Sequence, residues 1–304
     1  MVKLLVIHHS ADYDGLFSGA VALHWLSSTA SEVDQHIEVR GWDFGDPVIS
    51  TCEFDRVYVL DLPIECQDGL KPLIWIDHHA SSIEKCAHLN IPGFQLDGVA
   101  ACRLAWAYFY QGAHGSGLNE LPTLQDFRER RVLEPLILTL VGEADVFDKS
   151  DPKSERLQFG LVAERCRSVD ECLGWLRHDS LCNVEFLCED GSAAMSWQNA
   201  FAEEVCRERG YMVELDKLKF WALCSVHCRS SLWFPATTIP EEADAIMSVR
   251  IKGDGQAALS LYHKPGREHL NLSLIASKYG GGGHRGACGF SVSLNQAITM
   301  GIVK

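Results

Sequence analysis

Residues 3–15 read Lys-Leu-Leu-Val-Ile-His-His-Ser-Ala-Asp-Tyr-Asp-Gly, and this stretch sets the fold that we expect for the chain. Its first five residues are mainly apolar and contain no Gly or Pro, as in a buried strand. Apolar runs at residues 57–60 and 73–76 have the same form, and they are followed directly by Asp61 and by residues 77–79, Asp-His-His. Because the carboxyl ends of parallel strands form a ligand-binding crevice, we expect these polar clusters to meet there.

The segments after each expected strand favour an α/β fold with a parallel sheet built from right-handed βαβ units. Residues 15–27 and 99–111 have helical apolar patterns, and residues 37–42 fit a further strand. The apolar pattern of residues 131–141 indicates a helix that ends at Gly-Glu-Ala-Asp, which presents Asp145 as one more acidic group.

A helix over residues 189–210, starting in Glu-Asp-Gly-Ser and closed by Gly210, is expected to join two domains. The first would span residues 1–188, and the second and smaller α/β domain residues 211–304, with the active site in the cleft between them. The pattern of the second domain predicts strands, a helix and a glycine-rich loop, in the order 220–226, 245–251, 257–262, 272–279 and 280–283.

The composition favours a globular protein that acts on small anionic substrates. With 304 residues and 47% hydrophobic content, the chain is long enough for two packed domains. Its formal net charge is −14, and the acidic excess lies in residues 1–210. Since such a surface repels polyanions, we expect a short nucleotide substrate and no long nucleic acid.

The sequence predicts a cytoplasmic location. Residues 1–10 lack the basic flank of a signal peptide, and no apolar run approaches the roughly 20 residues of a membrane span. The twelve cysteines contain no CxxC pair, so we expect reduced thiols. No membrane partner is expected, and a homodimer is left open.

The clustered residues point to a two-metal hydrolase site. Two divalent cations about 3.5–4 Å apart can activate a water and neutralise the oxygens of a transferred phosphoryl group. Mixed carboxylate and imidazole ligation suits two Mn²⁺ ions, with Mg²⁺ or Co²⁺ as alternatives. The candidate ligands are His8, Asp12, Asp14, Asp61, His78 and Asp145, and Asp148 and Asp151 compete with the last of them.

The order of these residues resembles the DHH phosphoesterase family, whose signature is an Asp-His-His triplet downstream of an H-x-x-x-D-x-D motif and a strand-end Asp. The resemblance implies one metal held by His8, Asp12 and Asp61. It implies a second held by Asp14, Asp61, His78 and Asp145. His79 would contact the scissile phosphate as a catalytic residue, and Asp77 would orient the histidines.

A second motif, residues 281–289, resembles the GGGH-x-x-A-x-G loop of the DHH-associated C-terminal domain, so the resemblance spans nearly the whole chain. Consecutive glycines let backbone N–H groups approach a phosphate, and charged side chains add donors. The substrate contacts that this implies are Gly281, Gly282, Gly283, His284 and Arg285.

Two positions depart from the family pattern. Residues 260–263, Ser-Leu-Tyr-His, replace an S-x-R motif that would bring Arg to the nucleotide. Tyr262 or His263 could instead stack on a base, and Arg250 or Arg267 could supply the charge. The Ser/Thr-rich helix start is replaced by Ala-Ala-Cys-Arg, where Arg103 is either a phosphate contact or a surface residue.

The sequence therefore predicts a manganese-dependent phosphodiesterase that cleaves short linear oligoribonucleotides, especially pGpG, to mononucleotides by two-metal hydroxide attack. Alternatives within the same chemistry are a cyclic-dinucleotide phosphodiesterase and a 3′-phosphoadenosine 5′-phosphate phosphatase. Inorganic pyrophosphatase ranks low because it would share only the first domain, and a long-strand exonuclease is disfavoured by the charge. A non-catalytic nucleotide sensor is the alternative of another class.

Overall fold

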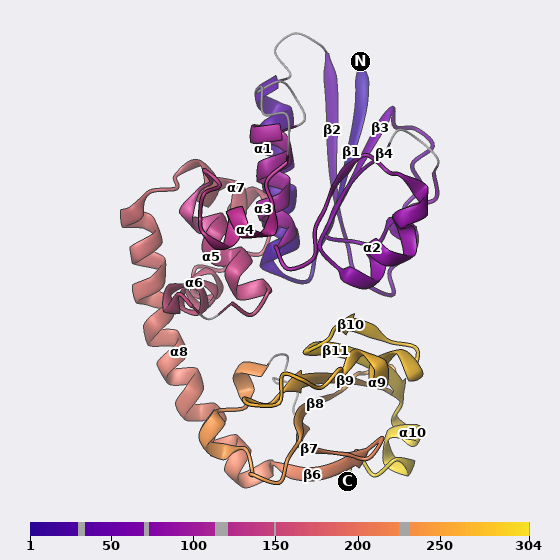
Figure 1. Ribbon diagram of the computed structural model, residues 1–304, viewed down its shortest axis with the longest axis vertical. Coiled ribbons are helices and arrows are strands. Elements are labelled where there is room, and N and C mark those ends of the chain that lie inside the picture. The colour runs from indigo at the N-terminus through magenta and orange to yellow at the C-terminus, as the bar shows by residue number, and fades with distance from the viewer. Residues whose placement is uncertain (30–33, 70–72, 113–120, 149, 225–230, 304) are drawn as a thin grey trace. The chain divides into compact units, whose positions relative to one another are not determined.

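The chain forms two compact units, Met1–Ala194 and Met195–Lys304, each with a sheet of its own (Figure 1). The computed structural model describes residues 1–29, 34–69, 73–112, 121–148, 150–224 and 231–303.

The first unit contains a five-stranded sheet in which every neighbouring pair of strands is parallel. The strand order is β2-β1-β3-β4-β5, which confirms the expected α/β class. The strand bounds are β1 Val2–His9, β2 Gln35–Trp42, β3 Arg56–Leu60, β4 Leu73–Asp77 and β5 Gly93–Gln95.

Both faces of this sheet are buried, because side chains alternate between them along each strand. Leu4 and Val6 of β1 pack in one core with helices α1 (Tyr13–Thr29) and α3 (Ala101–Trp106). Leu5 and Ile7 pack in a second core that reaches helix α2 (Ala80–Cys86). Figure 1 accordingly shows α1 and α3 on one side of the sheet and α2 on the other.

Four further helices complete the first unit before the long helix α8, and a π-helix over Ala107–Gly112 extends α3. The sequence predicted a helix over residues 131–141, but α5 begins only after Pro135, which lacks the N–H that a helix interior requires. The bounds are α4 Leu124–Arg128, α5 Leu136–Asp145, α6 Pro152–Ala163 and α7 Val169–Arg177.

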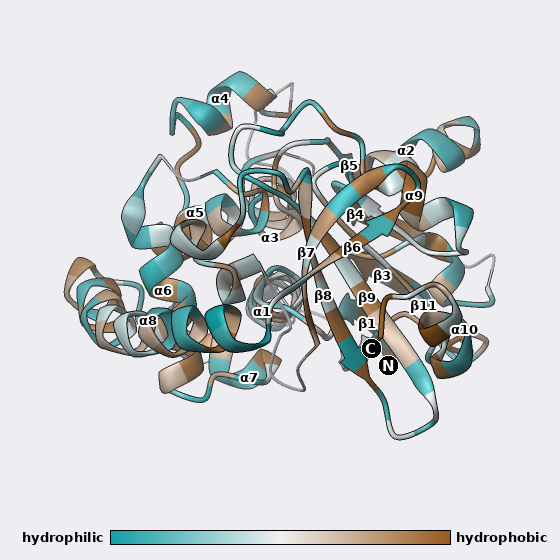
Figure 2. Cartoon of the chain, turned by 90° about the horizontal axis from the view of Figure 1, so that it is seen from below, coloured by the Kyte–Doolittle hydropathy of each residue, from teal (hydrophilic) through white to brown (hydrophobic). Residues whose placement is uncertain are grey.

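Helix α8 spans Leu181–Arg209, so the helix start predicted near residue 189 is wrong. Gly191 lies inside the helix, where a Cβ atom would come within 1.8 Å of the Arg156 carbonyl oxygen of α6. The glycine is there because two helix backbones approach each other closely, not because a helix begins. Along α8, hydrophilic and hydrophobic residues follow one another in bands (Figure 2).

The second unit contains a six-stranded sheet in the order β10-β11-β9-β8-β7-β6. Its pairs are antiparallel except for β7 with β8. The predicted strand 220–226 corresponds to β7, and its residues 225 and 226 lie outside the described residues. The element bounds are β6 Tyr211–Leu215, β7 Leu218–Cys224, β8 Ala245–Ile251, β9 Gln256–His263, α9 Ser273–Lys278, β10 Gly282–His284, β11 Ala287–Ser293 and α10 Leu294–Thr299.

In the described part of the chain, no helix is both long and apolar enough to cross a membrane. The cysteines in that part are free thiols, and most of them are buried.

Candidate metal centre

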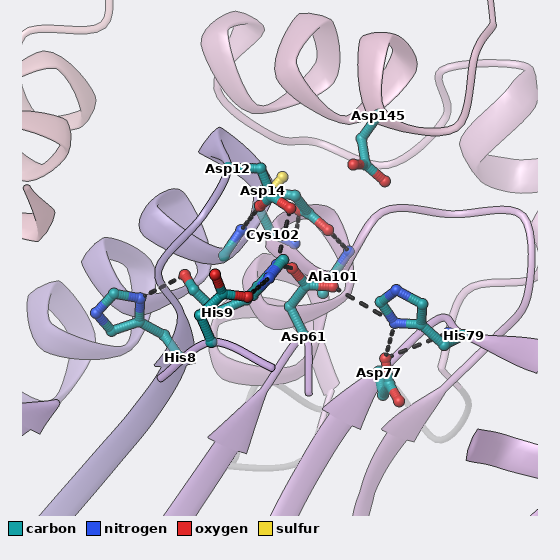
Figure 3. A network of polar contacts seen from close by, with 12 residues as sticks. His8, His9, Asp12, Asp14, Asp61, Asp77, His79, Ala101, Cys102 and Asp145 are labelled. Atoms are coloured by element: carbon teal, nitrogen blue, oxygen red, sulfur yellow. Dashed lines mark hydrogen bonds and ion pairs between the residues drawn. The ribbon is translucent and has the colours of Figure 1, made fainter. Parts of the chain in front are cut away.

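The polar residues that follow β1, β3 and β4 lie side by side, because these three strands are neighbours in the sheet. Figure 3 shows the carboxylates of Asp12, Asp14, Asp61 and Asp145 gathered at the carboxyl ends of the strands. Asp12 lies in the turn after β1, Asp14 in the first turn of α1 and Asp61 directly after β3, while Asp145 is the last residue of α5. The structure thus brings together the acidic residues that the sequence singled out.

Asp61 is the central residue of this cluster. Its backbone adopts a left-handed conformation, with φ of 57°, at the end of β3, and its N–H donates to the Ile76 carbonyl oxygen at 2.9 Å. Its two carboxylate oxygens face different partners: Oδ2 lies 3.3 Å from His9 Nδ1, and Oδ1 lies 3.3 Å from His78 Nε2. Uncommon backbone conformations of this kind cluster at functional sites, where the surrounding structure maintains them.

Asp14 is held by the start of a different helix. Its two carboxylate oxygens accept hydrogen bonds from the backbone N–H groups of Ala101, at 2.8 Å, and Cys102, at 2.7 Å. These are unpaired donors of the first turn of α3, which a carboxylate satisfies well. The expected Ser/Thr cap is therefore replaced by a carboxylate from α1, and Asp14 is fixed in orientation.

His78 lies among three carboxylates. Its Nε2 atom is 3.5 Å from Asp14 Oδ2, 3.3 Å from Asp61 Oδ1 and 3.4 Å from Asp145 Oδ2. Asp145 Oδ2 is buried and accepts no hydrogen bond from a described residue. One imidazole nitrogen thus forms ion-pair contacts with all three carboxylates, and the four groups converge on one point.

Asp12 lies on the other side of Asp61. Its Oδ1 accepts from the Gly15 N–H at 2.9 Å, while its Oδ2 lies 2.8 Å from His9 Nδ1. Two of the sets of possible ligand atoms among the described residues are His9 with Asp12 and Asp61, and Asp14 with Asp61 and His78; within each set the atoms lie within 4.8 Å of one another. The two sets share Asp61, as a carboxylate that bridges two cations would require.

The charges of the cluster also fit cations. Among the described residues, no lysine or arginine forms an ion pair with Asp12, Asp14, Asp61 or Asp145. Burial, together with the charge of Asp61, raises the pKa of the Asp14 carboxyl to about 7. Burial and Asp14 likewise raise the pKa of Asp145 above its ordinary value. Apart from imidazoles such as those of His9 and His78, no basic side chain of a described residue compensates these crowded, buried carboxylates. Such groups bind protons, and a divalent cation would replace those protons.

The imidazole of His9, and not that of His8, contacts the carboxylates. His8 Nδ1 donates to the His9 carbonyl oxygen at 2.7 Å, and its ring lies against Gly19 and Gly41. Figure 3 shows the His8 ring apart from the cluster. The spacing H-x-x-x-D in the sequence points to His8 and gives no signal for His9. Side-chain alternation puts His8 on the face of Leu4 and Val6, but the sequence gives no reason to prefer either face, since both are apolar.

We expect replacement of His9 with Ala to weaken Mn²⁺ binding at least about 10-fold, because changes beside metal ligands already cost 10- to 100-fold. Titration calorimetry of the metal-stripped protein measures this. The matched control is His8→Ala, which should lower thermal stability through lost packing and change the affinity less. A larger loss of affinity in the His8 variant would instead identify His8 as the ligand.

Asp77 orients the second histidine of its triplet. Its Oδ1 accepts from the His78 backbone N–H at 2.8 Å and lies 2.7 Å from His79 Nδ1. Because a carboxylate only accepts, Nδ1 of His79 carries a proton, and Asp77 thereby fixes the orientation of the ring. The His79 side chain is 22% exposed, against 2% for His78, so a molecule in solution can reach it.

Arg103 is buried, so the alternative that it is a surface residue is wrong. It is 4% exposed, and its Nε donates to Glu134 Oε1 at 2.7 Å. A second guanidinium nitrogen donates to the Phe127 carbonyl oxygen at 3.2 Å, and the guanidinium lies over the Phe127 ring. These contacts make Arg103 part of the packing of α3. The competing acids near Asp145 also have local roles: Asp148 accepts from the Ser150 N–H, and Asp151 caps α6.

The glycine motif of the second unit forms a hairpin. Residues 282–284 pair with residues 287–289, and Gly283 has φ of 122°. A Cβ atom at Gly281 would lie 2.0 Å from the Gly289 carbonyl oxygen, so this position requires glycine for packing. The predicted substrate contacts Gly281, Gly282, Gly283, His284 and Arg285 therefore lie on or beside one hairpin. Arg285 donates to the Leu270 carbonyl oxygen at 3.2 Å.

Two of the positions considered as replacements for the missing family arginine, His263 and Arg267, have partners within the second unit. His263 Nε2 lies 2.8 Å from the Leu270 carbonyl oxygen. Arg267 lies 3.5 Å from an Asp244 oxygen.

Comparison with known proteins shows which solved structures resemble this fold. No protein-family model matches the sequence, and no curated protein matches it either. Among solved structures, the pGpG-specific phosphodiesterase PggH from Vibrio cholerae has a TM-score of 0.51 at 14% identity, covering 99% of this chain and 96% of that one. An exopolyphosphatase-related protein from Bacteroides fragilis has a TM-score of 0.54 at 13% identity, covering 98% and 90%. Both belong to the DHH superfamily.

The chain has the DHH fold. At these identities the likeness concerns the fold, and it extends over nearly the whole length of both relatives. The chain's own Asp-His-His triplet, Asp77-His78-His79, lies at the end of β4.

Proposed function

We propose that the protein is a metal-dependent phosphodiesterase that hydrolyses short linear oligoribonucleotides, especially dinucleotides such as pGpG, to mononucleotides. The main observation in support of this proposal is that two sets of possible metal-ligand atoms share Asp61. Two divalent cations bound there would supply an activated water and neutralise the oxygens of an in-line phosphoryl displacement. Mixed carboxylate and imidazole donors favour Mn²⁺.

The residues around the cations have distinct roles in this proposal. Asp61 contacts both ligand sets, and the α3 N–H groups hold Asp14 so that it cannot rotate away. His79, which Asp77 orients through Nδ1, would contact a phosphate oxygen of the substrate. A substrate phosphate adds negative charge to an acidic cluster, so it is accepted only together with the cations.

The proposed substrate length rests on charge and on the fold. The net charge of −14 opposes the binding of a long polyanion. The similarity to a pGpG-specific phosphodiesterase covers nearly all of both chains, which favours a dinucleotide over a long strand. We propose that the glycine hairpin of residues 281–285 binds the non-scissile end of the substrate and that the protein acts in the cytoplasm.

A turnover comparison in the presence of Mn²⁺ tests the proposal. The substrates are pGpG, a ten-nucleotide single-stranded RNA, a cyclic dinucleotide and 3′-phosphoadenosine 5′-phosphate, and the Asp61→Asn protein is the control. The proposal predicts that pGpG is cleaved fastest and only in the presence of the metal. Preference for another of these substrates would keep the phosphoesterase and overturn its specificity, whereas binding without turnover would favour a nucleotide sensor.

A further inference from the structure

An exposed aromatic residue, Phe44, lies next to the metal centre at the corner of a tight turn. The turn follows β2, and it is closed by a hydrogen bond from the Asp46 N–H to the Asp43 carbonyl oxygen, at 2.9 Å. Gly45, at its third position, has φ of 104°, which a glycine adopts without strain. The turn therefore places the side chain of Phe44 at a projecting corner.

Side chains hold this turn in one shape. Asp46 Oδ2 accepts from the Asp43 N–H at 2.9 Å, and Asp43 Oδ1 accepts from the Phe44 N–H at 2.7 Å. Behind them, the buried Trp42 donates from Nε1 to the Pro47 carbonyl oxygen at 3.1 Å. Both carboxylates thus satisfy the backbone of the turn, and Phe44 is presented on a rigid support.

The Phe44 ring contacts a residue of the metal centre. Its centroid lies 6.1 Å from that of His9, with the two rings nearly perpendicular at 76°, and 5.5 Å from that of Trp42. Asp43 Oδ1 also lies 3.5 Å from His9 Nε2, so the turn and the metal centre share one imidazole. Despite these contacts, Phe44 is 66% exposed.

A rigidly held, exposed aromatic ring that contacts a residue of the metal centre differs from the single apolar residues that are commonly exposed on protein surfaces. Folding gains little from an aromatic ring that remains in water, and most residue types fit the second position of such a turn. A ring held rigidly beside a phosphate-binding centre can, however, bind a flat partner at little cost in conformational entropy. Asp43 and Asp46 lie in the same turn as Phe44, and their negative charge disfavours a phosphate there, so the expected partner is an uncharged ring.

We propose that Phe44 stacks on a nucleobase of the substrate and is a specificity-determining residue for nucleotides over simple phosphoesters. This inference rests on the proposed phosphodiesterase function and names the part of the substrate that the first unit recognises. The Phe44 ring lies close enough to the metal centre for this role, because His9 contacts both the ring and the carboxylates of Asp12 and Asp61. A base joined to the reacting phosphate through one ribose would then reach the ring.

Kinetics of Phe44→Ala test the inference with pGpG and two analogues, each of which lacks one of the two bases. Stacking of one base on an aromatic side chain strengthens binding by roughly 5- to 150-fold. We therefore expect kcat/KM for pGpG to fall about 10- to 100-fold, mainly through KM, and this loss to shrink to a few-fold for one of the two analogues. Phe44→Trp should retain the activity, and Phe44→Leu should not.

The matched control is Phe186→Ala on α8, which removes another exposed phenylalanine, 48% exposed, with no ring contact to the metal centre among the described residues. Binding of 5′-GMP to each variant, measured by calorimetry in the presence of Mn²⁺, gives a readout that does not depend on turnover. An equal loss on pGpG and on both analogues would overturn the stacking role while leaving the proposed function intact. Absence of turnover by the wild-type protein on all three substrates would overturn the function and this inference with it.

Discussion

Replacing Asp61 with Asn is expected to lower manganese-dependent turnover of pGpG by more than about 100-fold, because changes outside the ligand set already cost up to that factor. Asp61 contributes an oxygen to each of the two ligand sets. The amide of Asn has only one oxygen and carries no charge, so it cannot bridge two cations. One substitution therefore weakens both sites at once.

The choice of Asn separates chemistry from folding. Asp61 has φ of 57°, which Asn tolerates and Ala does not adopt easily, so Asp61→Ala would combine lost ligation with backbone strain. In the presence of a chelator, the Asn variant should unfold at nearly the wild-type temperature. Added Mn²⁺ should raise the unfolding temperature of the wild-type protein and not of the variant. Full turnover by a folded Asn variant would contradict the shared-ligand assignment.

Replacing Arg103 with Ala is expected to lower the free energy of unfolding by about 3–5 kcal/mol, the usual cost of removing one partner of a buried ion pair. Glu134 would remain buried without its cation, and burial already raises the pKa of its carboxyl. The Phe127 carbonyl oxygen would also lose a donor. Denaturant unfolding followed by circular dichroism measures the change.

A double variant distinguishes this structural role from substrate binding. Arg103→Met together with Glu134→Met removes both charges and keeps most of the volume, so much of the lost stability should return. Its KM for pGpG should stay close to the wild-type value. If the double variant were stable but had a much higher KM, Arg103 would be a substrate contact after all.

The sequence predicts the parallel sheet and the acidic cluster well, for one physical reason. Strands β1, β3 and β4 each contain an uninterrupted apolar run, and each run stops where the polar residues begin, so one pattern indicates both the strand end and the possible ligands. The position of Asp61 between two stronger motifs identified it, although a lone Asp after a strand says little. Its left-handed backbone is a tertiary feature, which no local pattern indicates.

Other features depend on contacts between distant segments. The choice between His8 and His9 is decided by which side of the strand faces the carboxylates, and both sides of β1 are apolar. Arg103 looks like a phosphate contact until its partner Glu134, 31 positions along the chain, is seen beside it. Gly191 resembles a helix start because close packing against α6 leaves no local signal.

Calorimetric titration of the metal-stripped wild-type protein with Mn²⁺ tests the central claim most directly. The account predicts two bound ions per chain, with protons released on binding because carboxylates and imidazoles must lose them. Binding of no ions, or binding that the Asp61→Asn protein reproduces unchanged, would contradict a metal centre built around Asp61.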